Sequence, residues 1–398
     1  MKAHGPLTKR FAIAALAALL LLYSFARAQT TQSNTPRKID RPLNLLVLGD
    51  SISWGQGLKD EHKAWYLVKT WLRQNTGREV LERIEAHSGA VIGTVNQSEP
   101  PAFSDLDGEL SRGYPTINGQ LDHALKMYAD PLTVDLVIVD GCINDLDSRR
   151  LLNAANTPDG IRELAQAKCG LPVEALLMRI TNVFPNAHVV ITGYYPILSE
   201  KSANDLFMRA LAKRFYLPEA GTPKITDKIL RARLIAISRE WYHTSDQMLS
   251  AAARKVDAQL QARGSHQRAL FADAGFHPDH SFAANHSRLW GFDASAVRKL
   301  LVVLSLGRVQ LRANDERRTQ RDELCKALLP PALSESPEQK VIREDRLLRC
   351  KLAAVGHPNR KGAAMYADAI GTVLKPLLAN SGWIKDANTA TTAVTPQR

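Results

Sequence analysis

Three short polar clusters contain the side chains that acyl transfer requires. Gly49-Asp50-Ser51 and Asn144-Asp145 each follow an apolar run, and His357 stands on a Pro-containing turn far along the chain. Acyl transfer needs a hydroxyl nucleophile and an imidazole that takes its proton. It also needs donors aimed at the developing oxyanion, which the Asn144 side chain and an unobstructed backbone amide at Gly89 offer. We therefore predict Ser51 as nucleophile, His357 as general base, and Ser51, Gly89 and Asn144 as oxyanion hole.

Five segments, most of them apolar, are predicted strands, and two of them end just before the Ser51 and Asn144 clusters. They are Leu43–Leu48, Val80–Ile84, Val134–Val139, His188–Thr192 and, as a weaker fifth, Leu270–Ala272. Helical spacing of apolar residues occurs in Ala64–Gln74, Leu121–Tyr128, Glu174–Phe184 and Asn359–Lys375. This alternation predicts an α/β fold of three layers, α/β/α, around a parallel sheet of about five strands. Ligands bind beyond the carboxyl ends of such strands, where the polar clusters stand.

The domain organisation follows from the same pattern. We expect one catalytic domain over residues 42–380, with helical insertions near 199–263 and 295–350, where charged helical stretches carry few strand signals. Residues 381–398 are rich in Thr and Ala and are expected to form a disordered tail.

The N-terminal segment has the three parts of a secretory signal. A basic start precedes the apolar run Phe11–Phe25, and Ala26-Arg27-Ala28 supplies small residues for cleavage after Ala28. We therefore expect a signal peptide over 1–28, a linker over 29–41, and a secreted or periplasmic protein. The alternative is an uncleaved anchor, but the apolar run is shorter than a bilayer span needs. No later stretch predicts a membrane span.

Cysteine usage and charge limit the other classes of function. Export permits disulfides. The four cysteines allow three pairings. The pairing of Cys325 with Cys350 is favoured because these two flank a short, charged segment, and it leaves Cys142 to pair with Cys169. No CxxC or Cys/His cluster has metal-ligand spacing, so we expect no metal and no cofactor. The formal net charge is +12, but the basic residues are not grouped with aromatic ones, and we expect no nucleic-acid partner.

On these motifs, from Leu43 to Leu378, the chain resembles the SGNH hydrolases, also called the GDSL esterase/lipase family. Gly49-Asp50-Ser51, Gly89, Asn144-Asp145 and His357 match its four blocks. The resemblance implies a flavodoxin-like sheet, a carboxylic ester as substrate, and the same roles for Ser51, Gly89, Asn144 and His357. Asp50 we interpret as a structural hydrogen-bond acceptor at the turn.

The chain departs from the family pattern at three positions. Ile52 replaces the usual Leu, and Cys142 holds the glycine place of the third block. The family usually has Asp three residues before the catalytic His, where this chain has Ala354. The role of orienting His357 must then fall to a backbone carbonyl, such as that of Ala354, or to a remote acid.

Alternatives remain for the base and for the function. His277-Pro278-Asp279-His280, preceded by Asp273, also groups imidazoles with carboxylates and is a rival base or substrate-binding loop. His286 and Trp290, with His277, are candidates for the substrate pocket. The expected substrate is a small-molecule, lipid or acylated-glycan ester. A carbohydrate O-deacetylase is the alternative within the class, and a catalytically inactive binding or assembly protein, suggested by Ala354, is the alternative outside it.

Overall fold

Five parallel strands form one sheet in the order β2-β1-β3-β4-β5. The strands are β1 (Leu43–Val47), β2 (Val80–Ile84), β3 (Val134–Val139), β4 (His188–Thr192) and β5 (Ala269–Ala272). This computed structural model describes residues 41–93, 107–110, 116–218, 225–293, 311–332, 334–378 and 383–384. The predicted signal peptide and nearly all of the predicted linker and tail lie outside these residues. The strand order is that of a doubly wound sheet, as predicted.

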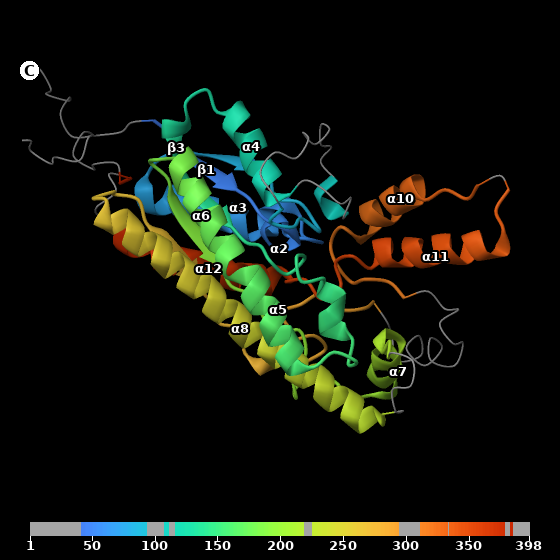
Figure 1. Ribbon diagram of the computed structural model, residues 1–398. Coiled ribbons are helices and arrows are strands. Elements are labelled where there is room, and N and C mark those ends of the chain that lie inside the picture. The colour runs from blue at the N-terminus through green and yellow to red at the C-terminus, as the bar shows by residue number, and fades with distance from the viewer. Residues whose placement is uncertain are drawn as a thin grey trace, which may run out of the picture. The chain divides into compact units, whose positions relative to one another are not determined.

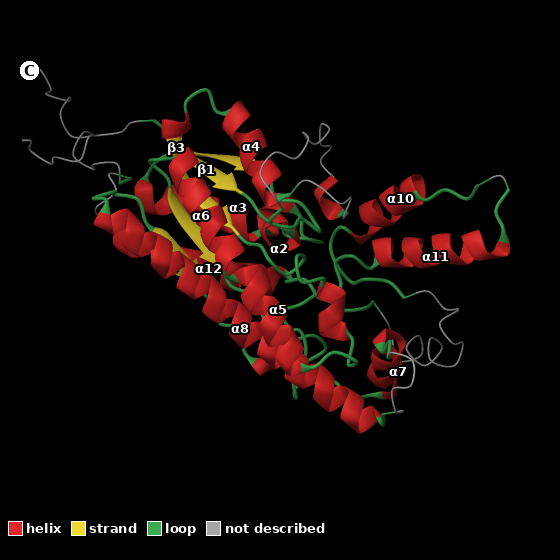
Figure 2. Cartoon of the chain, viewed as in Figure 1, coloured by secondary structure: helices red, strands yellow, loops and turns green. Residues whose placement is uncertain are grey.

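Helices connect and cover the strands (Figures 1 and 2). The α-helices are α2 (Ser51–Trp54), α3 (Ala64–Thr76), α4 (Ile117–Met127), α5 (Pro158–Cys169), α6 (Leu171–Val183), α7 (Leu206–Phe215), α8 (Asp227–Ala262), α10 (Arg318–Leu328), α11 (Pro337–Lys351) and α12 (Arg360–Leu378). Short 3-10 helices occupy Asp60–His62, Asp107–Glu109, Pro131–Thr133, Ser148–Leu152 and Pro278–His280.

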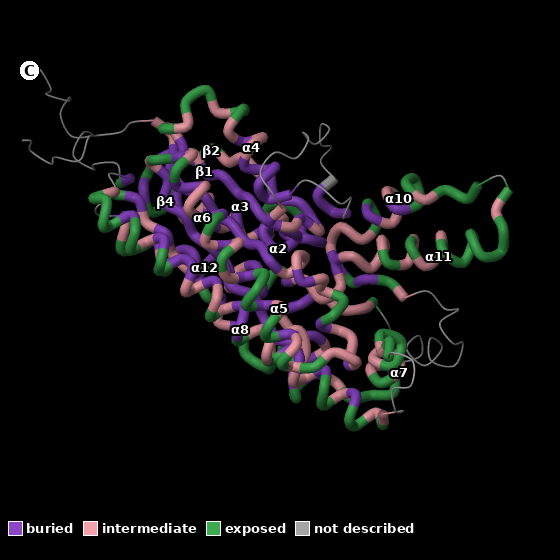
Figure 3. Tube along the Cα trace, viewed as in Figure 1, coloured by how far each residue is buried: buried purple, intermediate pink, exposed green. Residues whose placement is uncertain are grey.

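The sheet is buried on both faces, and successive residues of each strand point to opposite faces. Leu46 and Val137 belong to an apolar cluster that includes residues of α4, α6 and α8. Leu45 and Ile138 belong to a second cluster, formed with α3 and α12. These two clusters make the three layers, and Figure 3 shows the strands as the buried centre between exposed helices.

Capping residues explain where the helices differ from the prediction. Helix α4 begins at Ile117, four residues before the predicted start, because the Thr116 side chain accepts the backbone N–H of Gly119. Helix α5 was not predicted at all. It begins after Thr157, whose side chain accepts the N–H of Gly160, with Pro158 in the first turn. The residues Thr157-Pro158 are the start signal that sequence inspection missed.

The two stretches predicted as insertions differ from one another. Residues 199–263 contain α7 and α8, and α8 packs on α5, α6 and β5. Helix α8 connects β4 to β5 and belongs to the helical layer of the sheet, so this stretch is only in part an addition. In the second stretch, α10 and α11 pair with one another, as the orange helices of Figure 1 show.

Two disulfides cross-link the described part of the chain. Cys142 is bonded to Cys169, and Cys325 to Cys350, which confirms the favoured pairing. The first ties the turn after β3 to the end of α5, and the second joins α10 to α11. None of the helices in the described ranges is both long and apolar enough to cross a bilayer.

Candidate active site

Ser51 and His357 are in direct contact at the carboxyl edge of the sheet. Nε2 of His357 lies 2.7 Å from Oγ of Ser51, although 306 positions separate them in the chain. Ser51 opens α2 four residues after β1, and its side chain is only 6% exposed. The first amides of a helix have no acceptor within the helix, which leaves the Ser51 N–H available to a ligand.

Two buried carboxyl groups hold the turn that carries Ser51. Asp140, directly after β3, accepts the backbone N–H of Asp50 at 2.7 Å and that of Ser53 at 2.9 Å. Asp50 accepts the N–H of Ile52 at 2.9 Å, in the structural role predicted for it. Burial, and then the charge of Asp140, raise the pKa of Asp50 well above its usual value. Burial also raises the pKa of Asp140, and the backbone N–H groups of Asp50 and Ser53 that donate to it oppose this.

The same turn requires glycine at its entry. Gly49 has φ of 128°, and a Cβ built there would lie 1.8 Å from Oδ1 of Asp140. The amide and carbonyl of Gly49 each make a 2.8 Å hydrogen bond with the side chain of Gln120 in α4. The position and direction of Ser51 are therefore set from β3 and α4, not by α2 alone.

The turns after β2 and β3 are joined to each other beside Ser51. The side-chain amide of Asn144 donates to the carbonyl of Ala90 at 2.9 Å. Both oxygens of Asp145 accept the N–H of Ile92, at 3.2 and 3.1 Å. Gly89 has φ of 78°, which a side chain would disfavour. Gly89 and Asn144, two of the three predicted oxyanion donors, thus lie on turns that hold one another in place.

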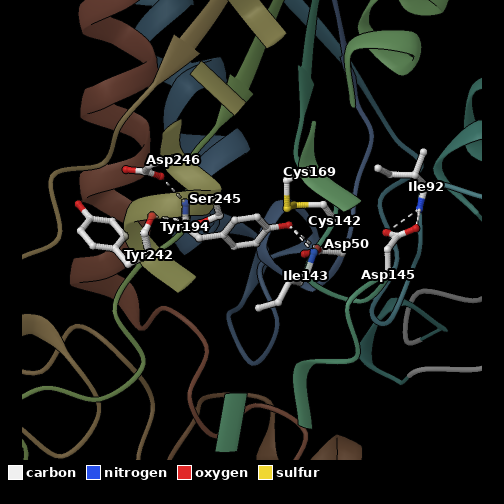
Figure 4. The surroundings of a disulfide bond; sticks show 10 residues. All are labelled: Asp50, Ile92, Cys142, Ile143, Asp145, Cys169, Tyr194, Tyr242, Ser245 and Asp246. Atoms are coloured by element: carbon white, nitrogen blue, oxygen red, sulfur yellow. Dashed lines mark hydrogen bonds between the residues drawn. A yellow bond between two sulfur atoms is a disulfide. The ribbon is translucent and has the colours of Figure 1, made fainter. Parts of the chain in front are cut away.

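A disulfide and a tyrosine fix the turn after β3 from the other side (Figure 4). Cys142 is fully buried and has φ of 112°, in the region that glycine tolerates and other residues avoid. This explains the glycine found at that place in the family pattern. The hydroxyl of Tyr194 accepts the N–H of Ile143 and donates to Asp50, both at 3.2 Å, so it joins the first and third motifs.

The turn that carries His357 is held by an extended segment that precedes α10. Trp290 donates its backbone N–H to the carbonyl of His357 at 2.7 Å, and its own carbonyl accepts the N–H of Gly356 at 2.9 Å. Leu289 and Pro358 form an antiparallel bridge beside these bonds. The hydroxyl of Tyr195 donates to the carbonyl of Gly356 at 2.9 Å.

The environment of His357 keeps its ring neutral. Burial lowers the pKa of His357 to about 4, and the carbonyl of Ala354 opposes this in part. A neutral imidazole can accept a proton from the Ser51 hydroxyl. Nδ1 of His357 is buried and has no hydrogen-bond partner among the described residues. The carbonyl of Ala354 accepts the backbone N–H of His357 at 3.0 Å and also raises the pKa of the ring, so it acts on both the turn and the ring.

The other candidate residues from the sequence have different surroundings from those of Ser51 and His357. His277 is exposed, and its backbone N–H donates to Nδ1 of His280 at 3.2 Å within a local turn. His286 is exposed as well. Trp290 is close to the catalytic pair through its backbone contacts with the His357 turn. No group of three or more potential metal ligands is found among the residues that the structure describes.

An apolar cavity of about 200 Å³ opens beside the segment that holds His357. Gly291 and Phe292, which follow Trp290, line this mostly apolar cavity together with Ala203, Phe207, Met208, Phe282 and Ala283 and one acidic residue, Asp205. The ring centroids of Phe207 and Phe292 lie 5.5 Å apart, and those of Phe282 and Phe292 lie 5.8 Å apart, with the rings edge to face. A cavity of about 150 Å³ with apolar walls holds a benzene molecule.

Several residues of the site were not identified as such from the sequence. Asp140 and Gln120 contact the Ser51 turn, and Tyr195 contacts the His357 turn. Asp140 had one visible signal: it is a carboxylate directly after an apolar strand end. For Tyr195 the sequence offered only the similarity of Tyr194-Tyr195-Pro196 to the family, and the contact of Gln120 arises from packing between distant segments.

The chain was compared with protein-family models and with curated proteins, and none matches it. Solved structures do resemble it. An extracellular lipase from Streptomyces rimosus has 18% identity and a TM-score of 0.38, over 62% of this chain and 87% of that one. A phospholipase A1 from Streptomyces albidoflavus NA297 has 14% identity and a TM-score of 0.37, over 64% and 89%. A putative arylesterase from Agrobacterium tumefaciens str. C58 has 17% identity and a TM-score of 0.32, over 84% and 99%.

Proposed function

We propose that the protein is a serine hydrolase that cleaves carboxylic esters, with Ser51 as nucleophile and His357 as general base. The observation that carries the proposal is the 2.7 Å contact between Nε2 of His357 and Oγ of Ser51, with the ring neutral at ordinary pH. A serine hydroxyl becomes an effective nucleophile when an adjacent base takes its proton. The hydrogen bond that holds the Asn144 turn to the turn after Gly89 favours this proposal over a binding protein that has lost its chemistry.

The reaction follows from this geometry in two stages. Oγ of Ser51 attacks the ester carbonyl carbon while Nε2 of His357 takes the hydroxyl proton. The tetrahedral oxyanion receives hydrogen bonds from the amides of Ser51 and Gly89 and from the Asn144 side chain. The C–O bond to the alcohol breaks as His357 returns the proton to the leaving oxygen. Water, deprotonated by His357, then attacks the acyl carbon. The bond from that carbon to Oγ of Ser51 breaks as His357 returns the proton to Oγ, which releases the acid and restores the serine hydroxyl.

The apolar cavity supports a substrate with an apolar group of moderate size. Its volume of about 200 Å³ exceeds that of the cavity known to hold benzene. The wall residues Gly291 and Phe292 continue the segment that contacts His357. We therefore expect an acyl chain or aryl group larger than acetyl, which separates an esterase or lipase from the O-deacetylase alternative.

We also propose that the protein is exported and acts outside the cytoplasm, with one hydrolase domain over residues 42–380. The two disulfides support export, since they form and persist in oxidising compartments. N-terminal sequencing of the mature protein from its native host tests cleavage after Ala28; a mature chain that still begins at Met1 would contradict it.

The test of the function is active-site labelling with a fluorophosphonate, followed by a hydrolysis profile over acyl length. The wild-type protein should label at Ser51 and hydrolyse p-nitrophenyl esters, and Ser51→Ala should do neither. Ser53→Ala is the control, since Ser53 lies in the same turn and its backbone and side chain hydrogen-bond Asp140, whereas His357 contacts Ser51. A folded wild-type protein that does not label would support the binding protein instead. Activity confined to acetyl esters would support the deacetylase.

A further inference from the structure

A buried arginine lies between the two turns that carry Ser51 and His357. Arg321 of α10 has a side chain that is 0% exposed. Its guanidinium makes a two-pronged contact with Asp315, of which the Nη1–Oδ1 arm measures 2.9 Å, and Nη1 also donates to Glu109 at 3.2 Å. Nε donates to the carbonyl of Lys351 at 3.4 Å. We call Arg321, Asp315 and Glu109 the Arg321 cluster.

Glu109 connects this cluster to the turn that follows Ser51. Its Oε2 accepts the side-chain amide of Gln56 at 2.8 Å, and its Oε1 accepts the N–H of Gly57 at 3.4 Å. Gln56 in turn donates its backbone N–H to the carbonyl of Ser51 at 2.9 Å. A chain of hydrogen bonds therefore runs from Arg321 to the nucleophile.

Lys351 connects the same cluster to the turn that precedes His357. Lys351 is the last residue of α11 and follows Cys350, which is bonded to Cys325 in α10. The disulfide and the Arg321–Lys351 contact hold the end of α11 against α10 at the point where the chain enters the His357 turn.

The two turns also touch directly, with no room between them. A Cβ built on Gly57 would lie 2.7 Å from Cβ of Ala354 and 3.0 Å from Cβ of Asp315. Ala354 is fully buried and holds the place of the acid that the family pattern puts before the catalytic His. In this chain the space beside that position is filled by the turn after Ser51.

We propose that Arg321, with Asp315 and Glu109, is a positioning residue of the active site: it sets the separation of the Ser51 and His357 turns, in place of an acid that binds Nδ1. The proposal rests on the proposed function. Enclosing a guanidinium with two carboxylates costs desolvation energy, and such clusters contribute more to a unique arrangement than to stability. In this structure the arrangement of the two turns brings Nε2 of His357 into contact with Oγ of Ser51.

The charges of the cluster also reach the catalytic ring. Besides burial and the carbonyl of Ala354, the charge of Arg321 lowers the pKa of His357 and that of Asp315 raises it. The other groups that contact the ring or its turn, the hydroxyls of Ser51 and Tyr195, are neutral. Changes of charge in the cluster should therefore alter the titration of His357.

Arg321→Lys tests the geometric part. Lysine keeps the charge but cannot make the two-pronged contact, so the turns should shift, and a shift of about 1 Å lowers turnover by up to about 100-fold. We expect kcat and the rate of fluorophosphonate labelling to fall together while KM changes little. Arg268→Lys is the matched control, because Arg268 makes a similar contact with Asp257 before β5, at the opposite edge of the sheet. It should lower Tm without lowering kcat.

Opposite charge changes test the electrostatic part. The acid limb is the pH range in which kcat/KM falls as His357 takes up a proton. Arg321→Gln removes a positive charge and should move this limb to higher pH, whereas Asp315→Asn removes a negative charge and should move it to lower pH. A cluster that only stabilised the fold would lower Tm in both variants and leave the limb in place, which would overturn this part of the proposal.

Gly57→Ala provides a steric test that changes no charge, although the added methyl also meets Asp315, and it remains usable if the charge variants do not fold. The added methyl must push the Ser51 turn away from Ala354, so kcat should fall without a shift of the acid limb. A folded Gly57→Ala protein with wild-type kcat would refute the positioning role. If the wild-type protein itself neither labels nor hydrolyses esters, the proposed function fails instead, and the two failures are thus distinct.

Discussion

The Asn144 side chain donates a 2.9 Å hydrogen bond to the carbonyl of Ala90, so one amide links two turns while its second N–H stays available to a substrate. We expect Asn144→Ala to lower kcat by about 100-fold to 1,000-fold, the usual effect of losing one oxyanion donor, with little change in KM. Steady-state kinetics on a p-nitrophenyl ester measures this.

Asn118→Ala controls for loss of the turn alone, since the Asn118 side chain also holds the turn after β2, through the carbonyls of Ile92 and Gly93. Equal losses of kcat in the two variants would mean that Asn144 acts only on the structure.

The pH dependence of hydrolysis should report the neutral state of His357. Because burial lowers its pKa to about 4, the ring accepts a proton at any higher pH. We expect kcat/KM to rise as pH passes 4 and to stay level through neutral pH. The folded pKa lies below the unfolded value near 6.5, so the stability that the neutral ring contributes is present above pH 6.5 and is lost as pH falls through 4. Circular dichroism at each pH separates the two effects, and an acid limb near 6.5 would contradict the assignment.

Asp246 of α8 should make the protein less stable as the pH rises. Burial, and then the charge of Asp273, raise the pKa of Asp246 to about 7, well above the value in an unfolded chain. The stability associated with its protonated form is present below about pH 4 and is lost as pH rises through 7. Asp246→Asn keeps an oxygen that can accept the N–H of Tyr194 and cannot ionise. The free energy of unfolding of Asp246→Asn minus that of wild type, measured in urea, should increase by on the order of 1 kcal/mol from pH 5 to pH 8. The same difference at both pH values would argue against the raised pKa of Asp246.

Cys142 combines a cross-link with a backbone conformation that suits glycine. Cys142→Ser/Cys169→Ala should lose about 3 kcal/mol with the disulfide. Cys142→Gly/Cys169→Ala loses the same cross-link but relieves the strain of φ at 112°, and should be more stable than the serine variant by about 1 kcal/mol. Chemical denaturation compares the two directly. Equal stabilities would show that the positive φ costs the cysteine nothing.

The apolar cavity should determine which esters react fastest. Phe292→Ala removes the ring shared by the two edge-to-face pairs, so kcat/KM for butyrate to octanoate esters should fall about 10-fold, and that for acetate should change little. Phe215→Ala serves as control, because Phe215 ends α7 at the exposed surface. A parallel loss for all chain lengths would place the acyl group elsewhere.

The sequence was informative wherever a local pattern carries the structure. Three of the five strands have their predicted limits. For β3 and β4 the reason is a mostly apolar, fully buried segment that ends directly before Asp140 or Gly193. Ser51 and His357 could be proposed as partners, since each stands where a doubly wound sheet exposes polar groups. The helix boundaries were less accurate, as for α4, because a cap depends on one side chain that periodicity does not detect.

Contacts between distant segments could not be foreseen. The pairing of Trp290 with the His357 turn, the Asp140 carboxylate below Ser51 and the Arg321 cluster each join residues that no spacing rule relates. The orienting partner of His357 shows the difference most clearly: the sequence revealed that an acid was missing at Ala354, and only the packing of Gly57 against that residue showed what fills the space.

The order of segments along the chain also separates completion of the sheet from completion of the proposed catalytic pair. Strand β5 ends at Ala272, yet the proposed base stands at position 357, just before α12. A chain that has formed its whole sheet, with Ser51 in place, would therefore still lack the proton acceptor until the segment around His357 folds onto it.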